Sequence, residues 1–120
     1  MPVAESKSLK LDAAGRLAVD LLMELLALHG PSGSEQPVVD FIKSRLSRIK
    51  LPKDAWASDS AYKRSPIGGS VGNLALRLPG TVKAPRRMLS AHMDTVPLCA
   101  GAVPVRKGSR IVAALSLIHI

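Results

Sequence analysis

Residues 90–97, with the sequence SAHMDTVP, hold the side chains whose types and spacing best suit chemistry. Residues i and i+2 of a strand share a face, so His92 and Asp94 at a strand's end would project into the same crevice. A neutral imidazole is a common zinc ligand, and a carboxylate that accepts its other ring N–H fixes the tautomer and makes the ligand more basic. The same pair also fits a capping aspartate beside a surface histidine, so the spacing alone leaves both interpretations open.

The other residues that could do chemistry have simpler explanations. Cys99 has no paired His and Asn, so we expect a small buried apolar residue rather than a reactive thiol. The glycine-rich run at 68–72 lacks the Lys-Ser/Thr of a phosphate loop. His29 is expected at the C-terminus of a helix, where an imidazolium suits the helix dipole. His119 lies in an atypical tail at 115–120, so we expect it to have no catalytic role.

Length and composition exclude several classes of protein. The chain has 120 residues, of which 47% are apolar and 22% charged, as expected for one small globular domain or a piece of a larger one. Aromatic residues make up only 2%, which argues against binding of single-stranded nucleic acid by base stacking. A single cysteine excludes an internal disulfide framework and a Cys-rich zinc site.

The net charge of +8 leaves a polyanion partner to be considered. A basic run follows the apolar stripe of a predicted helix, and a solvated helix face explains it better than a nucleic-acid patch. It consists of Lys43, Arg45, Arg48, Lys50 and Lys53. No apolar run reaches the length of a membrane span, and no signal peptide stands out. We therefore expect a cytoplasmic protein with neither a nucleic-acid nor a membrane partner.

Apolar periodicity predicts two helices in the first half of the chain. Leucines recur at helical spacing through residues 13–29, and Gly30-Pro31 forms a helix stop. A second helix follows, with Ser32 or Ser34 as its N-terminal cap. Its buried stripe is expected to comprise Val38, Ile42, Leu46 and Ile49.

Strand patterns dominate the second half. Residues 52–72 show neither period and are predicted to be irregular. Alternation predicts a strand at 74–78, and a second strand at 87–91 would run into His92. Residues 103–105 and 110–112 flank Lys-Gly-Ser at 107–109, which indicates a hairpin. Two helices followed by strands of a mixed sheet predict an α/β domain.

The stretch around His92 resembles the first metal motif of the M20 family of zinc metallopeptidases. The motif is AHMDTVP at 91–97, and it is preceded by VGNLALRL at 71–78. Upstream, LLALHGPSGSE at 25–35 is similar to that family's first helix, loop and second helix. Within the family the nearest resemblance is to peptidase T-like tripeptide aminopeptidases.

The resemblance implies a two-zinc active site that hydrolyses short peptides. It assigns His92 as a ligand of one zinc and Asp94 as the active-site carboxylate that orients it. The family also uses a bridging Asp, a Glu–Glu pair and a further His, all downstream, whereas no Asp or Glu follows Asp94 here. We therefore expect residues 1–114 to be the N-terminal part of a zinc-exopeptidase-like catalytic domain, inactive by itself. The alternatives are a deacylase or amidohydrolase on the same site, or a small basic nucleic-acid-binding module.

The last six residues differ in character from the rest. Residues 115–120, LSLIHI, resemble the translation of a transposon end that is used to prepare sequencing libraries. An ordinary apolar strand is the alternative. We expect these residues to be non-native and to form no part of the domain.

Overall fold

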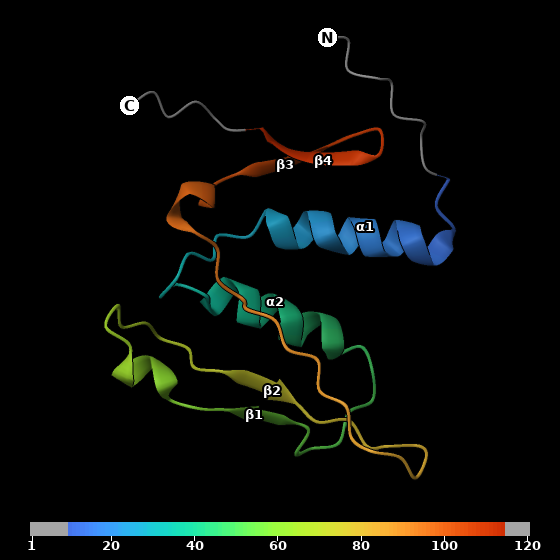
Figure 1. The fold of residues 1–120 in the computed structure, drawn as a ribbon, viewed down its shortest axis with the longest axis vertical. Helices are drawn as coiled ribbons and strands as arrows, with labels where there is room; N and C mark the ends of the chain where they lie inside the picture. The colour runs from blue at the N-terminus through green and yellow to red at the C-terminus, as the bar shows by residue number, and fades with distance from the viewer. Residues whose placement is uncertain (1–9, 115–120) are drawn as a thin grey trace. The chain divides into compact units, whose positions relative to one another are not determined.

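The computed structural model describes residues 10–114, so the predicted tail at 115–120 and His119 lie outside the described residues. The chain divides into two compact units. One contains residues 29–100, and the other is formed by residues from both ends of the chain. Figure 1 traces the order of the elements along the chain.

The unit built from the two ends contains a helix and a hairpin. Helix α1 (Ala13–Leu26) begins after Asp12, whose carboxylate accepts a hydrogen bond from Gly15 N at 2.7 Å. It ends three residues short of the predicted 13–29. His29 therefore lies beyond the last turn, and the helix-dipole explanation for it is wrong. Neither described α-helix is long and apolar enough to cross a membrane.

The predicted hairpin near the end of the chain is confirmed. Strands β3 (Val103–Lys107) and β4 (Arg110–Ala114) pair antiparallel, with Lys107 opposite Arg110. The two-residue loop has a positive φ at Gly108 (60°) and not at Ser109. A positive φ at the first loop residue alone is the signature of a type II′ turn, which matches the twist of the flanking strands.

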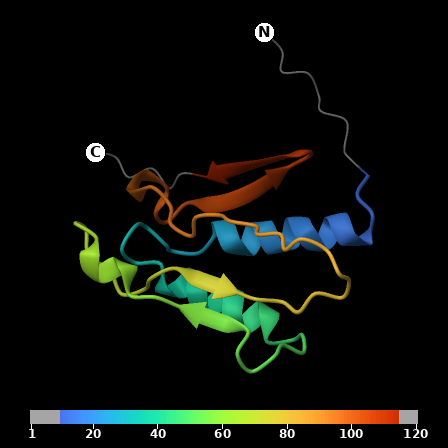
Figure 2. The same ribbon diagram turned by 60° about the horizontal axis from the view of Figure 1, so that its bottom comes forward.

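The unit at 29–100 places a helix beside a short β-ribbon. Helix α2 (Gln36–Leu46) lies next to strands β1 (Trp56–Ser58) and β2 (Leu74–Leu76) (Figures 1 and 2). The strands pair antiparallel, with Trp56 opposite Leu76. Leu74 and Leu76 are half-buried and Ala75 is exposed, so the predicted alternation is confirmed over the three residues of β2. The buried apolar residues of the described chain are Val38, Val39 and Ala55.

Residues 52–72, predicted to be irregular, contain β1 and a 3-10 helix, η1 (Ala61–Arg64). Asp59 joins them to the chain before β2: its Oδ1 accepts from Ala61 N at 3.0 Å and from Asn73 N at 2.9 Å. Its Oδ2 accepts from Asn73 Nδ2 at 2.8 Å. A Cβ on Gly72 would collide with Asp59, so glycine permits this close approach. The Asp59–Asn73 hydrogen bonds help to explain why β1 forms here, although its three residues are too few to show an alternating pattern.

The α/β class is confirmed, but the sheet differs from the prediction. In place of one mixed sheet, residues 10–114 form two separate two-stranded antiparallel sheets. The predicted strand at 87–91 is wrong, because a strand exists only where a neighbour completes its hydrogen bonds and no described strand pairs with it. Met88 and Leu89 in this segment are 88% and 100% exposed.

The Asp59 contact makes the stability of this unit depend on pH. Hydrogen bonds from Ala61 N, then from the Asn73 side chain and backbone, lower the pKa of Asp59. A carboxylate with a depressed folded-state pKa stabilises the fold above its unfolded pKa, and this stabilisation is lost as the pH falls through the folded pKa. We expect Asp59→Ala to unfold at a lower temperature than wild type at about pH 7, with the gap narrowing below about pH 4.

Thermal unfolding followed by circular dichroism at several pH values would measure this gap. Asp54→Ala is the matched control, because Asp54 is an exposed acid with no hydrogen bond to its side chain from the described residues. A gap for Asp59→Ala that stayed constant from neutral to acid pH would contradict the assignment.

Candidate functional site

Two segments far apart in the sequence meet at the predicted site. Thr95 N donates a hydrogen bond to Gly30 O at 2.8 Å, and Pro31 and Thr95 form an isolated parallel β-bridge. Both segments belong to the unit at 29–100. The loop between the two helices is thereby held against the residues that follow His92.

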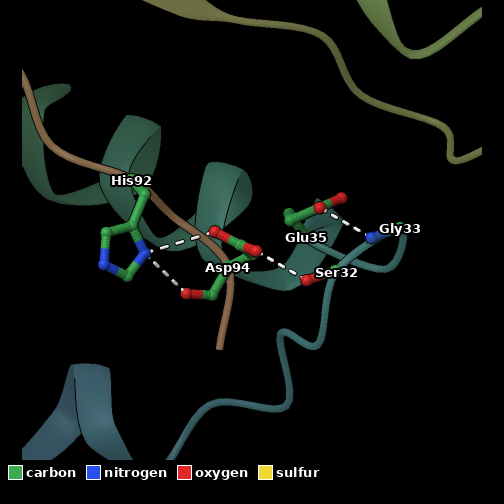
Figure 3. Close-up of polar contacts among 5 residues, drawn as sticks. All are labelled: Ser32, Gly33, Glu35, His92 and Asp94. Carbon is green, nitrogen blue, oxygen red and sulfur yellow. Dashed lines mark hydrogen bonds and ion pairs between the residues drawn. The ribbon is translucent and has the colours of Figure 1, made fainter. Parts of the chain in front are cut away.

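The loop contains a tight turn that presents Ser32 to Asp94. Ser34 N donates to Pro31 O at 2.8 Å, and Gly33 has a φ of 89°, which together define a type II turn with Ser32 as its second residue. Glu35 Oε1 accepts from Gly33 N at 2.7 Å (Figure 3). The expectation that Ser32 or Ser34 caps α2 is wrong: Glu35 occupies the cap position and makes no side-chain cap bond.

His92 and Asp94 lie in direct contact, as expected (Figure 3). Nδ1 of His92 is 3.2 Å from Asp94 Oδ1 and 2.9 Å from the carbonyl oxygen of Asp94. Both oxygens are acceptors at neutral pH, so Nδ1 must carry the proton and, in a neutral ring, Nε2 carries the lone pair. The His92 side chain is 85% exposed, so its second nitrogen is free for a ligand.

Asp94 is held through both of its carboxylate oxygens. Ser32 Oγ donates to Oδ2 at 2.6 Å, while Oδ1 faces His92. The Ser32 hydroxyl, with a smaller contribution from His92, lowers the pKa of Asp94. Asp94 is therefore an anion at neutral pH, the form that accepts hydrogen bonds from both neighbours.

The surroundings of the pair differ from the predicted ones in two respects. His92 and Asp94 do not follow a strand, because residues 87–91 form none. Cys99, expected to be buried, is exposed at the end of a second 3-10 helix, η2 (Pro97–Cys99). An open hollow of about 1840 Å³ beside β2 has both His92 and Asp94 in its lining.

Ser32 is the residue that sequence reasoning missed. Its spacing to Glu35 matches a capping box, which predicts a role in helix capping. Glycine two residues after Pro31 was the available signal, since a type II turn requires a positive φ at its third position. The hydroxyl of a serine at the second position of such a turn can bind a residue far away in the sequence. Its partner Asp94 is 62 residues away, so nothing in the local sequence predicts the contact.

The pair suits one position of a zinc site. It offers an open imidazole nitrogen whose opposite N–H is held by a carboxylate, the usual second partner of a metal-bound histidine. Within residues 10–114, no three His, Cys, Asp or Glu side chains are grouped so that they could hold a metal ion. Because protein zinc sites use three or four ligands, zinc here would need donors beyond the described residues.

Comparison with known proteins gives one similarity to a peptidase. Over 81 residues, or 68% of this chain, it is 28% identical to a Bacillus subtilis (strain 168) protein named "Putative aminopeptidase YhfE". The chain spans about a fifth of that protein's length, since the match covers 20% of it. No protein-family model and no solved structure matches the chain.

The contact between the loop and the site depends on a buried glycine. A Cβ on Gly30 would lie 2.6 Å from Val38 Cγ2, and Val38 is itself buried. Overpacking of this kind costs about 1–3 kcal/mol. We expect Gly30→Ala to lower the free energy of unfolding by about that amount in urea titrations, and Val38→Ala in the same chain to recover part of the loss.

Gly80→Ala is the matched control for this prediction. The nearest atom to a Cβ at Gly80 is Val82 O at 3.7 Å, an ordinary contact, so the change should be close to neutral. Equal losses in the two glycine variants would show that crowding against Val38 is not the cause.

Proposed function

We propose that residues 1–114 are the N-terminal part of the catalytic domain of an M20-type zinc exopeptidase that removes amino-terminal residues from short peptides. The observation that carries the proposal is the His92–Asp94 pair, with Nδ1–H held by oxygen acceptors and Nε2 exposed. The similarity to a protein named as an aminopeptidase supports the same class of reaction.

In this proposal His92 holds one of two zinc ions through Nε2. The zinc pair supplies Lewis-acid chemistry for amide hydrolysis when bound. Asp94 keeps the proton on Nδ1, so that Nε2 is presented as a lone pair, and its negative charge makes the imidazole a stronger donor. The other zinc ligands and the general base would come from residues beyond those described.

The proposed chemistry agrees with the polarity of the site. The Ser32 hydroxyl helps to keep Asp94 ionised, and an ionised Asp94 accepts the hydrogen bond from His92 Nδ1–H, which leaves the lone pair on Nε2. The hollow that His92 and Asp94 line is open, so a peptide could reach the pair from solvent.

We expect the full-length gene product to hydrolyse di- and tripeptides in a zinc-dependent manner. His92→Ala should abolish turnover and reduce bound zinc, because an imidazole ligand is lost. Asp94→Asn should lower kcat/KM by about 10–100-fold, the usual effect of removing the partner of a metal-bound histidine. His29→Ala is the control, since His29 is an exposed histidine that is not among the described hydrogen-bond or ion-pair partners of the pair. Initial-rate kinetics and metal analysis of each variant provide the measurement.

Other results would point to other functions. Hydrolysis of N-acyl amino acids in place of peptides would indicate a deacylase or amidohydrolase. DNA binding with a steep salt dependence and no hydrolysis would indicate a basic nucleic-acid-binding module. The 120-residue chain alone should show no turnover and only weak zinc binding by calorimetry, because one imidazole cannot hold zinc tightly. Zinc-dependent turnover by this chain, lost in His92→Ala, would show instead that it holds the whole site.

A further inference from the structure

We propose that Ser32 is a positioning residue for the metal-binding histidine: its hydroxyl anchors Asp94 so that the other carboxylate oxygen stays on His92 Nδ1. Its relevance to catalysis rests on the proposed function. The hydrogen bonds that link Ser32, Asp94 and His92 are observed in the structure and do not depend on that function.

The direction of each bond in this chain is fixed by chemistry. Ser32 Oγ lies 2.6 Å from Asp94 Oδ2, and His92 Nδ1 lies 3.2 Å from Oδ1 of the same carboxylate. An ionised carboxylate only accepts, so the hydroxyl donates at one end and the imidazole N–H donates at the other. The short distance to Ser32 is typical of a charge-assisted hydrogen bond, which makes it the stronger anchor of the two.

Ser32 is held in place from more than one side. The type II turn at residues 31–34 defines its backbone, and the Thr95–Gly30 hydrogen bond ties the start of the turn to the site. The loop before β2 also lies against the turn, because a Cβ on Gly69 would be in ordinary contact with Gly33 Cα at 3.4 Å. The turn is already ordered by these contacts, so the Ser32–Asp94 hydrogen bond costs little further conformational entropy.

The hydroxyl has no competing structural task in the described chain. Ser32 does not cap α2, whose cap position is Glu35, and its hydroxyl bonds to Asp94. Without the hydroxyl, the half-exposed Asp94 carboxylate would be free to rotate into water. His92 Nδ1 would then keep only the carbonyl oxygen of Asp94 as an acceptor.

The test reads the tautomer of His92 directly in the 120-residue chain labelled with ¹⁵N. At about pH 8.5, long-range ¹H–¹⁵N spectra of a neutral imidazole distinguish the protonated ring nitrogen from the unprotonated one. In wild type we expect Nδ1 protonated and Nε2 unprotonated. In Ser32→Ala both nitrogen resonances should move toward the values of a mixture of tautomers.

Matched variants separate this role from a general effect on the fold. Ser32→Thr keeps a hydroxyl and should restore the wild-type spectrum. Ser34→Ala removes a hydroxyl two residues away, for which the described residues offer no hydrogen bond, and should leave His92 unchanged. If Ser32→Ala loses its dispersed amide signals, Ser32→Cys replaces it, since a thiol keeps the size but is a weak donor. A wild-type tautomer in folded Ser32→Ala, or in Ser32→Cys where Ser32→Ala does not fold, would overturn the proposal.

Kinetics of the full-length gene product distinguish this inference from the proposed function. Ser32→Ala should lower kcat by up to about tenfold with KM unchanged, less than the loss of Asp94 itself. A tautomer that shifts in Ser32→Ala, in a full-length protein without zinc-dependent hydrolysis, would refute the function and leave the positioning role intact. Active enzyme whose tautomer and kcat are unaffected by Ser32→Ala would refute the positioning role and leave the function intact.

Discussion

The structure of the candidate site depends on the contact between the loop after α1 and the segment that carries His92. Thr95 N–H on Gly30 O, together with the bridge between Pro31 and Thr95, joins residues that the chain separates by most of the unit. Without this contact, Ser32 would not face Asp94. The Asp94 carboxylate would then keep only His92 as a partner. A buried glycine at position 30 is part of the same constraint, because the loop passes close to Val38.

Polar contacts fix much of the loop conformation in this unit because its apolar core is small. Val38, Val39 and Ala55 are the buried apolar residues of the described chain, and none is large. Larger apolar side chains of the unit are exposed, including Leu89 at 100% and Met88 at 88%. A core of this size cannot by itself specify the course of long loops. Hydrogen bonds from Asn73 to Asp59 and from Ser32 to Asp94 supply that specification instead.

Sequence reasoning predicted the features that are determined locally. Two helices follow from leucine and valine periodicity, and the hairpin follows from glycine between two alternating runs, because both are built from near neighbours. The contact between His92 and Asp94 belongs to the same class, since their spacing is two residues.

The features that were missed depend on distant partners. Residues 87–91 have the composition of a strand but no described strand to pair with. β1 exists because β2 supplies its hydrogen-bond partners, while Asn73 binds Asp59 just after it. The local sequence around Ser32 predicts a helix cap, but its hydroxyl donates a hydrogen bond to Asp94 instead. Cys99 was expected to be buried from its chemistry, whereas η2 leaves it exposed. In each case tertiary contacts outweigh the local preference.

Hydrogen exchange at the Thr95 amide tests the central claim most directly. The account predicts that this N–H, bonded to Gly30 O, exchanges at least about tenfold more slowly than the unpaired amides of residues 87–91, after correction for intrinsic rates. Exchange of Thr95 as fast as that of the exposed segment would show that the loop and the site segment are not joined in solution, and the arrangement of Ser32, Asp94 and His92 would lose its basis.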